Sequence, residues 1–233
     1  MGPGSEAGVT QADCERAVPA YFPAMPQPSR IADLPPRAFA KADPSPDGAF
    51  YAHPRMVAHI DTGAIAAVGR LYAELIPDGA RVLDLMSSRY SHFPDGFAPA
   101  HVTGHGMNAE ELAANPALDD WFTQNLNEDQ ALPLDTDGLG ACTCCVSVQY
   151  LQHPVAVFAE VARILRPGAP FVATYSNRCF PTKAVAVWQS LPPAGQAAYL
   201  TAAMEEAGMT AEAREVLAPG QGGDPLWAVV GRA

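Results

Sequence analysis

One uninterrupted apolar run, residues 141–148, limits the possible folds more than any other stretch of the chain. Each of its residues is apolar or small, and turn signals bound it, Asp137-Gly138 before it and Gln152-His153-Pro154 after it. A strand without alternation of apolar and polar residues is buried on both faces. The run therefore predicts a central strand of a parallel sheet with helices over both faces.

The segments around this run alternate between strand and helix patterns, which is typical of an α/β domain. The chain of 233 residues, 48% of them hydrophobic, is long enough for one sizeable core. Further strands are predicted over residues 81–85, 100–104, 121–125, 171–175 and 226–230, and helices over 54–75, from 109 onward, and over 154–165, 181–190 and 195–207. Asn108 is expected to cap the second helix, with Glu111 completing a capping box. Ligands of parallel sheets bind at the carboxyl ends of the strands, so the residues after each strand are the functional candidates.

The first 54 residues are rich in proline, which fixes φ and removes a backbone donor, so neither regular helix nor central strand is expected there. We interpret residues 1–50 as an N-terminal proline-rich arm and residues 51–233 as the main domain; residues 1–5 look like a leader added for expression. A disordered tail is the alternative. Five aromatic anchors favour an ordered arm that lies over the domain as a lid: Tyr21, Phe22, Phe39, Phe50 and Tyr51.

Charge and cysteine usage exclude several classes of partner. The formal net charge is −11, which repels the phosphates of nucleic acids and anionic membranes, so we expect a small-molecule substrate, no nucleic acid and no membrane. There is no run of 18 apolar residues and no secretory signal pattern. Five cysteines, an odd number, do not form a disulfide framework and suit the reducing cytoplasm. We expect a cytoplasmic protein, a monomer or a homodimer.

The cysteines of residues 142–145 do not predict a metal site. On a strand, Cys142 and Cys144 point to one face and Cys145 to the other, so the three thiols cannot converge on one ion. Buried cysteines commonly act as small hydrophobes, and the paired ligand spacings of zinc sites are absent.

Several motifs within residues 50–233 resemble class I S-adenosylmethionine-dependent methyltransferases. The family pattern E-x-x-R-V-L-K-P-G-G is matched at Glu160, Arg163, Leu165, Pro167 and Gly168. Residues 132–134 resemble the L-P-F motif of the family, residues 82–85 its first strand, and residues 224–229 its closing hairpin. A group of methyltransferase type 11-like proteins is similar in residues 85–88, 106–108 and 176–184. The resemblance implies a Rossmann-like fold with a mainly parallel seven-stranded sheet, and S-adenosylmethionine as cofactor.

The chain departs from this family where the cofactor would bind. The family's first loop reads acidic-x-Gly-x-Gly-x-Gly, whereas residues 84–90 contain no glycine; Gly106 and Gly140 stand where the family has acidic residues. Small serines can still present backbone amides, and Asn108 can accept a ribose hydroxyl. The resemblance places Asp84 near the methionine amino group, with a helix cap as the alternative, and the loop after the third strand near adenine. The expected cofactor residues are Asp84, Met86, Ser87, Ser88, Gly106, Met107, Asn108, Asn125, Leu126, Asn127 and Ser147.

Methyl transfer depends mainly on positioning the reactants in a dry site, so few catalytic residues are expected. Tyr51, His59 and Tyr150 are the catalytic candidates, because a histidine or tyrosine can accept a proton or orient a nucleophile. A surface histidine and core tyrosines are the structural alternatives. Arg55 and His59, four residues apart, are expected on one helix face. Arginines at the pocket mouth would suit a carboxylate or phosphate. The expected substrate residues are Arg55, Arg89, Tyr90, His92, Asn177 and Arg178.

Two functions agree with these patterns. The first is methyl transfer from S-adenosylmethionine to a small-molecule acceptor. The second is a methyltransferase fold that has lost the cofactor and acts as a binding or scaffold subunit. A nucleotide-dependent oxidoreductase is excluded, since it needs G-x-G-x-x-G after the first strand and an acidic residue after the second.

Overall fold

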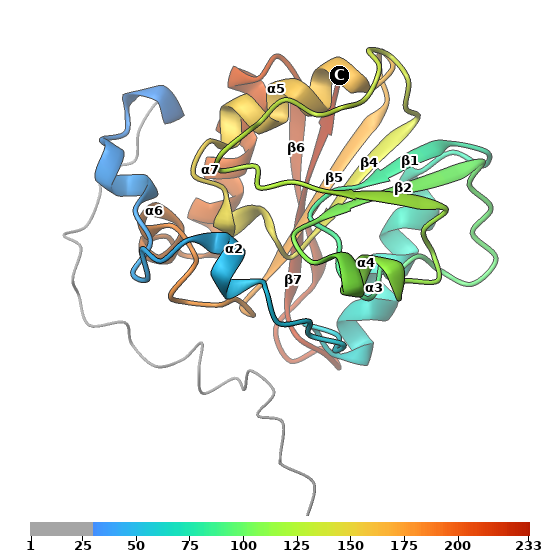
Figure 1. The fold of residues 1–233 in the computed structure, drawn as a ribbon, viewed down its shortest axis with the longest axis horizontal. Coiled ribbons are helices and arrows are strands. Elements are labelled where there is room, and N and C mark those ends of the chain that lie inside the picture. The colour runs from blue at the N-terminus through green and yellow to red at the C-terminus, as the bar shows by residue number, and fades with distance from the viewer. Residues whose placement is uncertain (1–29) are drawn as a thin grey trace, which may run out of the picture.

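Seven strands form one sheet in the order β3-β2-β1-β4-β5-β7-β6 (Figure 1). The computed structural model describes residues 30–233, so the predicted anchors Tyr21 and Phe22 lie outside the described residues. Strands β1 to β5 run parallel, and β7 pairs antiparallel with both β5 and β6. Their bounds are β1 Arg81–Asp84, β2 His101–Gly106, β3 Asp120–Thr123, β4 Ala141–Cys145, β5 Pro170–Ser176, β6 Thr210–Leu217 and β7 Leu226–Arg232.

Helices cover both faces of this sheet (Figure 1). Leu83, Cys142 and Cys144 point toward α5 and α7, whereas Val82, Ala141 and Val172 point toward α3, so each face has its own apolar cluster. The helices are α2 Asp47–Phe50, α3 Thr62–Leu75, α4 Ala109–Ala113, α5 Pro154–Ile164, α6 Ala186–Ser190 and α7 Pro193–Glu206, with short 3-10 turns η1 Ile31–Asp33, η2 Pro36–Phe39 and η3 Val148–Tyr150. Within residues 30–233, every helix is too short or too polar to cross a membrane.

The predicted fold class is confirmed, and β4 is the central strand that the apolar run predicted. Cys142 and Cys144 are fully buried on one face. The strand ends earlier than the run does, because Val146 adopts a left-handed φ of 46° and turns the chain into η3. The backbone N–H of Val146 still donates to the carbonyl of Thr174, which fixes this turn against β5.

The helix predicted from Pro54 begins only at Thr62. Asp61 is its N-cap and accepts from the N–H of Ala64 at 2.9 Å, so the capping carboxylate, and not the earlier proline, starts the helix. Residues 52–61 are irregular, and the expectation that Arg55 and His59 share a helix face is therefore wrong.

Other predicted boundaries shift by a few residues. Strand β2 continues to Gly106 and β3 starts at Asp120, because the two strands pair from Thr103 to Gly106. The helix predicted from 181 begins only at Ala186. Strand β6 was not found from its own sequence pattern, because none of its residues is buried.

The described part of the arm packs on the main domain. Ile31, Leu34 and Ala38 belong to the same apolar cluster as α5 and α7. The N–H of Ile31 donates to the carboxylate of Glu206 in α7, and the N–H of Ala186 donates to the carbonyl of Ala40. The division of the chain at residue 50 stays a prediction.

Candidate functional site

A pocket opens at the carboxyl ends of β1, β2, β3 and β4, where the strand order reverses between β1 and β4. The arm and the segment after β5 form its remaining walls. The lining residues are Asp47, Tyr51, Arg55, His59, Met86, Ser87, Ser88, His105, Gly106, Met107, Asn108, Glu111, Gln124, Asn125, Leu126, Asn127, Val146, Ser147, Tyr150, Leu151, Arg178, Cys179 and Phe180.

The loop after β1 is folded tightly against β2. The N–H of Ser87 donates to the carbonyl of His105 at 2.6 Å, and the N–H of Met86 donates to His105 Nδ1 at 3.1 Å. Met86 has a φ of 55°, and Ser147 Oγ donates to its carbonyl at 3.3 Å. Two amides of this loop are therefore already bonded to β2.

His105 lies directly after the predicted end of β2, among the residues that follow strands, but it was not named as a site residue. Its Nε2 lies 3.1 Å from the carbonyl of Gln124, while Nδ1 accepts from Met86. This pairing requires the neutral ring with its proton on Nε2. Burial lowers the pKa of His105 to about 4, so the ring stays neutral at physiological pH and fixes the loop geometry.

The expectation that Asp84 contacts the cofactor is not supported, because Asp84 does not line the pocket. It is 2% exposed, and its two carboxylate oxygens accept from Ser87 Oγ at 2.5 Å and Thr143 Oγ1 at 2.9 Å. Burial raises the pKa of Asp84 to about 6, and the hydroxyl hydrogen bonds act in the opposite direction. Asp84 therefore stabilises the loop after β1 through its hydrogen bond with Ser87, without lining the pocket itself.

Asn108 lines the pocket, but its side chain is already fully bonded within the protein. Its Oδ1 accepts from the N–H groups of Glu110 and Glu111, and its Nδ2 donates to the carbonyls of Tyr51 and Ala52. The predicted helix cap is confirmed. The predicted acceptor for a ribose hydroxyl is occupied, since both lone pairs of Oδ1 are in use.

Glu111 turns toward the pocket and does not close the predicted capping box. Its Oε1 accepts from the N–H of Arg55 at 2.6 Å and its Oε2 from Ser88 Oγ at 2.5 Å. It is 7% exposed and joins the arm to the loop after β1. A carboxylate accepts about four hydrogen bonds, so Glu111 retains capacity for further donors.

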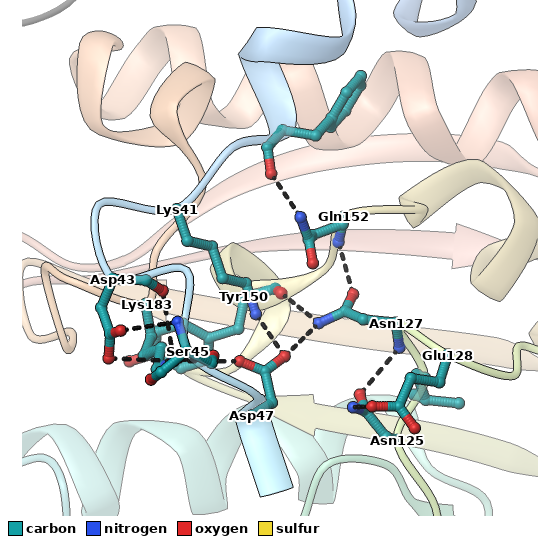
Figure 2. Close-up of polar contacts among 12 residues, drawn as sticks. Lys41, Asp43, Ser45, Asp47, Asn125, Asn127, Glu128, Tyr150, Gln152 and Lys183 are labelled. Carbon is teal, nitrogen blue, oxygen red and sulfur yellow. Dashed lines mark hydrogen bonds and ion pairs between the residues drawn. The ribbon is translucent and has the colours of Figure 1, made fainter. Parts of the chain in front are cut away.

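The loop after β3 contributes Asn125, Leu126 and Asn127 to the pocket wall. Asn127 Nδ2 donates to Asp47 Oδ2 at 2.9 Å and to the carbonyl of Tyr150 at 3.1 Å, and its Oδ1 accepts from the N–H of Gln152 at 2.7 Å (Figure 2). Asn125 bonds to its own loop, through Glu128 Oε1 and the N–H of Asn127. Leu126 is 3% exposed and offers an apolar surface.

The catalytic candidates Tyr51, His59 and Tyr150 all line one wall of the pocket with Phe180. The ring of Phe180 stacks on Tyr150 at 5.9 Å and meets His59 edge-on at 5.5 Å. The hydroxyl of Tyr150 accepts from the N–H of Phe180 at 2.8 Å. Burial lowers the pKa of His59 and raises those of Tyr51 and Tyr150, so all three side chains are neutral near pH 7.

The two arginines in the pocket wall are held by other groups of the protein. The guanidinium of Arg55 lies 4.5 Å from the ring centre of Phe50 and donates to the carbonyl of Phe50 at 3.1 Å. Arg178 Nε donates to Asp224 Oδ1 at 2.9 Å. Within residues 30–233, therefore, neither guanidinium is presented to the pocket as an isolated cation.

Four expected substrate residues lie outside the pocket lining: Arg89, Tyr90, His92 and Asn177. The segment after Ser88 turns toward α3, where Gly69 approaches the carbonyl of His92. Arg89 lies over the ring of Tyr90, which stacks on His92 at 6.4 Å, and Tyr90 is 43% exposed. The assignment of these four residues to substrate therefore stays a prediction without support from the pocket lining.

Seven further residues of the pocket wall were not named as site residues: Asp47, Glu111, Gln124, Val146, Leu151, Cys179 and Phe180. Glu111 lies one turn into a helix and Asp47 lies in the arm, so the rule that functional residues follow strands does not reach them. No group of three possible metal ligands occurs in the described part of the chain, and Cys142, Cys144 and Cys145 are free thiols.

No family model and no curated protein matches the sequence. Solved structures do match the fold. A chain from a complex of the Haloferax volcanii Trm112 methyltransferase activator has a TM-score of 0.56 and 15% identity, and the match covers 73% of this chain and 91% of that one. An S-adenosylmethionine-dependent methyltransferase from Mesorhizobium loti gives a TM-score of 0.53 at 15% identity, covering 72% of this chain and 98% of that one.

A third similar structure is the [4+2]-cyclase SpnF, with a TM-score of 0.53 and 15% identity over 78% of this chain and 86% of that one. At such identities the likeness shows the fold alone: this chain has the Rossmann-like fold of class I S-adenosylmethionine-dependent methyltransferases. Since one similar structure is a cyclase, the fold does not fix the reaction.

Proposed function

We propose that the chain transfers a methyl group from S-adenosylmethionine to a small-molecule acceptor. The observation that carries this proposal is a single pocket that gathers the ends of β1, β2, β3 and β4 at the point where the strand order reverses. Open α/β sheets bind their ligands in this crevice. The methyltransferase fold and the polar residues of the pocket support the same reaction class.

The residues present fit this cofactor in three respects. No partner within residues 30–233 engages the backbone N–H groups of Ser88 and Met107, which leaves them free for a carboxylate or a hydroxyl. Glu111 has a buried carboxylate with acceptor capacity for hydroxyl groups. Met86, Leu126 and Val146 supply an apolar wall for a planar ring. S-adenosylmethionine, when bound, supplies a sulfonium-activated methyl group.

The acceptor is proposed to lie against the wall of Tyr51, His59, Tyr150 and Phe180. The aromatic rings suit an apolar or planar molecule, and they exclude water from the place of transfer. His59 is neutral near pH 7, because burial lowers its pKa, and can therefore take up the proton of a hydroxyl or amine acceptor.

The net charge of −11 supports a small-molecule acceptor over a nucleic acid or a membrane surface. The free thiols of Cys142, Cys144 and Cys145 support a reducing cytoplasm. A monomer or a homodimer remains the expected assembly.

A second candidate function is a binding or scaffold role without catalysis. The favouring observation is that the protein itself bonds several polar groups around the pocket: Asn108 to the arm carbonyls and two amides of the first loop to His105. Under this alternative the pocket does not take up the cofactor.

Calorimetric titration with S-adenosylhomocysteine separates the two functions. We expect micromolar binding to the wild type and at least tenfold weaker binding to Glu111→Gln, because hydrogen bonds to a charged group contribute about 1.5–3 kcal/mol. The matched control is Glu110→Gln, an exposed glutamate of the same helix, which should bind like the wild type. The absence of heat and of thermal stabilisation at millimolar ligand would reject methyl transfer and favour the scaffold role.

A further inference from the structure

The only two lysines of the chain, Lys41 and Lys183, meet inside the protein beside the pocket. Their side chains are 5% and 0% exposed. Lys41 belongs to the arm, whereas Lys183 belongs to the segment between β5 and α6. An unpaired buried ammonium group is costly, so both lysines require partners.

Those partners come from one stretch of the arm, residues 43–47. Lys183 Nζ donates to the carbonyl of Ser45 at 2.7 Å and lies 3.1 Å from Asp43 Oδ2 and 3.7 Å from Asp47 Oδ1. Lys41 Nζ donates to Asp47 Oδ2 at 2.6 Å. We call this group, Lys41, Asp43, Ser45, Asp47 and Lys183, the arm latch (Figure 2).

Asp47 also extends the latch into the pocket wall. Its Oδ2 accepts from Asn127 Nδ2 at 2.9 Å in addition to Lys41 (Figure 2). Asn127 in turn donates to the carbonyl of Tyr150, the last residue of η3, and accepts from the N–H of Gln152, two residues further along the chain. One carboxylate thus joins the arm, the segment after β5, the loop after β3 and the residues around η3.

We propose that Asp47 is a positioning residue that couples closure of the arm to the geometry of the 125–127 loop. The inference rests on the proposed function, because it assigns that loop to the cofactor side of the pocket. Lys183 and Lys41 fix the carboxylate in place, and the fixed carboxylate orients the amide of Asn127. The cofactor side of the pocket therefore reaches its binding geometry only when the arm is latched.

Hydrogen–deuterium exchange of the full chain without ligand tests the coupling directly. In Asp47→Asn we expect the N–H groups of Glu128, Asp129 and Gln152, which are hydrogen-bonded in or to the loop, to exchange at least tenfold faster than in the wild type. The arm amides of residues 47–51 should also exchange faster. Glu74→Gln, which removes one carboxylate from an exposed ion pair with Arg214, is the control and should leave both regions unchanged.

Asn127→Ala separates the coupling from the latch itself. This variant keeps the ion pairs of Asp47 with the two lysines, so the arm amides should stay protected while the loop amides lose protection. It also keeps the test available if Asp47→Asn does not fold. Loop exchange at the wild-type rate in Asn127→Ala, or in a folded Asp47→Asn, would overturn the proposal.

Calorimetric titration with S-adenosylhomocysteine on the same variants links the coupling to the proposed function. We expect both Asp47→Asn and Asn127→Ala to bind about tenfold more weakly than the wild type, with Glu74→Gln unchanged. Wild-type affinity in both folded variants would overturn the coupling. If the wild type itself shows no binding, the proposed function fails, while the exchange experiment still decides whether Asp47 couples the arm to the loop.

Discussion

Two non-glycine residues with left-handed backbone, Met86 and Val146, stand at the loops after β1 and β4, with φ of 55° and 46°. Met86 takes the place of the first glycine in the family's loop pattern, and glycine is the residue that adopts a positive φ without steric cost. Val146 is β-branched, which makes this backbone conformation costly. Both residues line the pocket, and the hydroxyl of Ser147 lies within hydrogen-bond distance of the carbonyls of Met86 and Cys145, so it connects the two loops.

Asp84 makes the stability of the fold depend on pH. Burial raises its pKa from 3.8 to about 6, so between these values the folded protein binds more protons than the unfolded chain. The free energy of unfolding therefore falls as pH rises through this window. The difference corresponds to about 3 kcal/mol.

We expect Asp84→Asn to remove most of this fall, because an amide does not titrate and can still bond to Ser87 and Thr143. Urea unfolding at pH 4 and pH 7 measures the effect, with the exposed Asp78→Asn as control. An equal fall in the wild type and in Asp84→Asn would show that another group is responsible.

His59 is the residue whose replacement should affect turnover without affecting cofactor affinity. General base catalysis contributes typically 100-fold or more, so His59→Gln should lower kcat by about that factor. Because burial lowers the pKa of His59 from its usual value, the wild-type rate should fall only at pH values below the usual titration range of histidine. The rate of S-adenosylhomocysteine release measures both effects.

His53→Gln, at an exposed position of the same segment, is the control. Equal rates in His59→Gln and His53→Gln would remove His59 from the mechanism.

At the scale of elements, two reciprocal hydrogen bonds join the N-terminus of α3 to the β6–β7 connection. Asp61 Oδ2 accepts from the N–H of Asp224 at 2.8 Å, and Asp224 Oδ2 accepts from the N–H of Asp61 at 3.0 Å. A Cβ on Gly63 would lie 2.1 Å from the carbonyl of Gly222, so only glycine allows this approach. Through Arg178, the same Asp224 reaches the pocket wall.

Asp61→Ala should therefore lower the free energy of unfolding by about 2 kcal/mol, about half from the lost helix cap and half from the unpaired N–H of Asp224. Asp61→Asn keeps the cap and should lose about 1 kcal/mol. Urea unfolding measures both values. A loss below 0.5 kcal/mol in Asp61→Ala would show that water replaces both contacts.

The elements that the sequence predicted well are those whose pattern follows from burial on both sides. Strand β4 consists of apolar or small residues because helices cover both of its faces. Strand β6 lies at the edge of the sheet with no buried residue, so it has no apolar pattern to read. The start of α3 was misplaced because Pro54 suits a first helical turn, while the residue that caps the helix is Asp61.

The candidate site could be predicted where it depends on the ends of strands. The loops after β1, β2 and β3 were located from the order of strands and turns alone. Asp47 and Glu111 could not be located in this way, because each enters the pocket through contacts with residues far away in the chain. The bonds of Asp84 to Ser87 and Thr143, outside the pocket lining, could not be predicted, because its position in the chain says nothing about the face of the sheet on which its carboxylate lies.

At the scale of the whole molecule, the excess of acidic residues opposes binding to other polyanions. With a net charge of −11, the protein gains nothing from counterion release at a phosphate backbone. We expect no retention on heparin at about 50 mM salt, where basic nucleic-acid-binding proteins are held most strongly. Retention that weakens with added salt would reveal a local basic surface and would argue for a nucleic-acid substrate.

The burial of both lysines in the arm latch has a practical consequence for chemical labelling. Amine-reactive esters and aldehyde cross-linkers find no exposed ε-amine among residues 30–233, so they should react mainly with the α-amine of the chain. Coupling through amines would then attach the protein to a surface mainly through that one group. Acylation of Lys41 or Lys183 requires the arm to lift, so its rate, followed by mass spectrometry, reports how often the pocket opens.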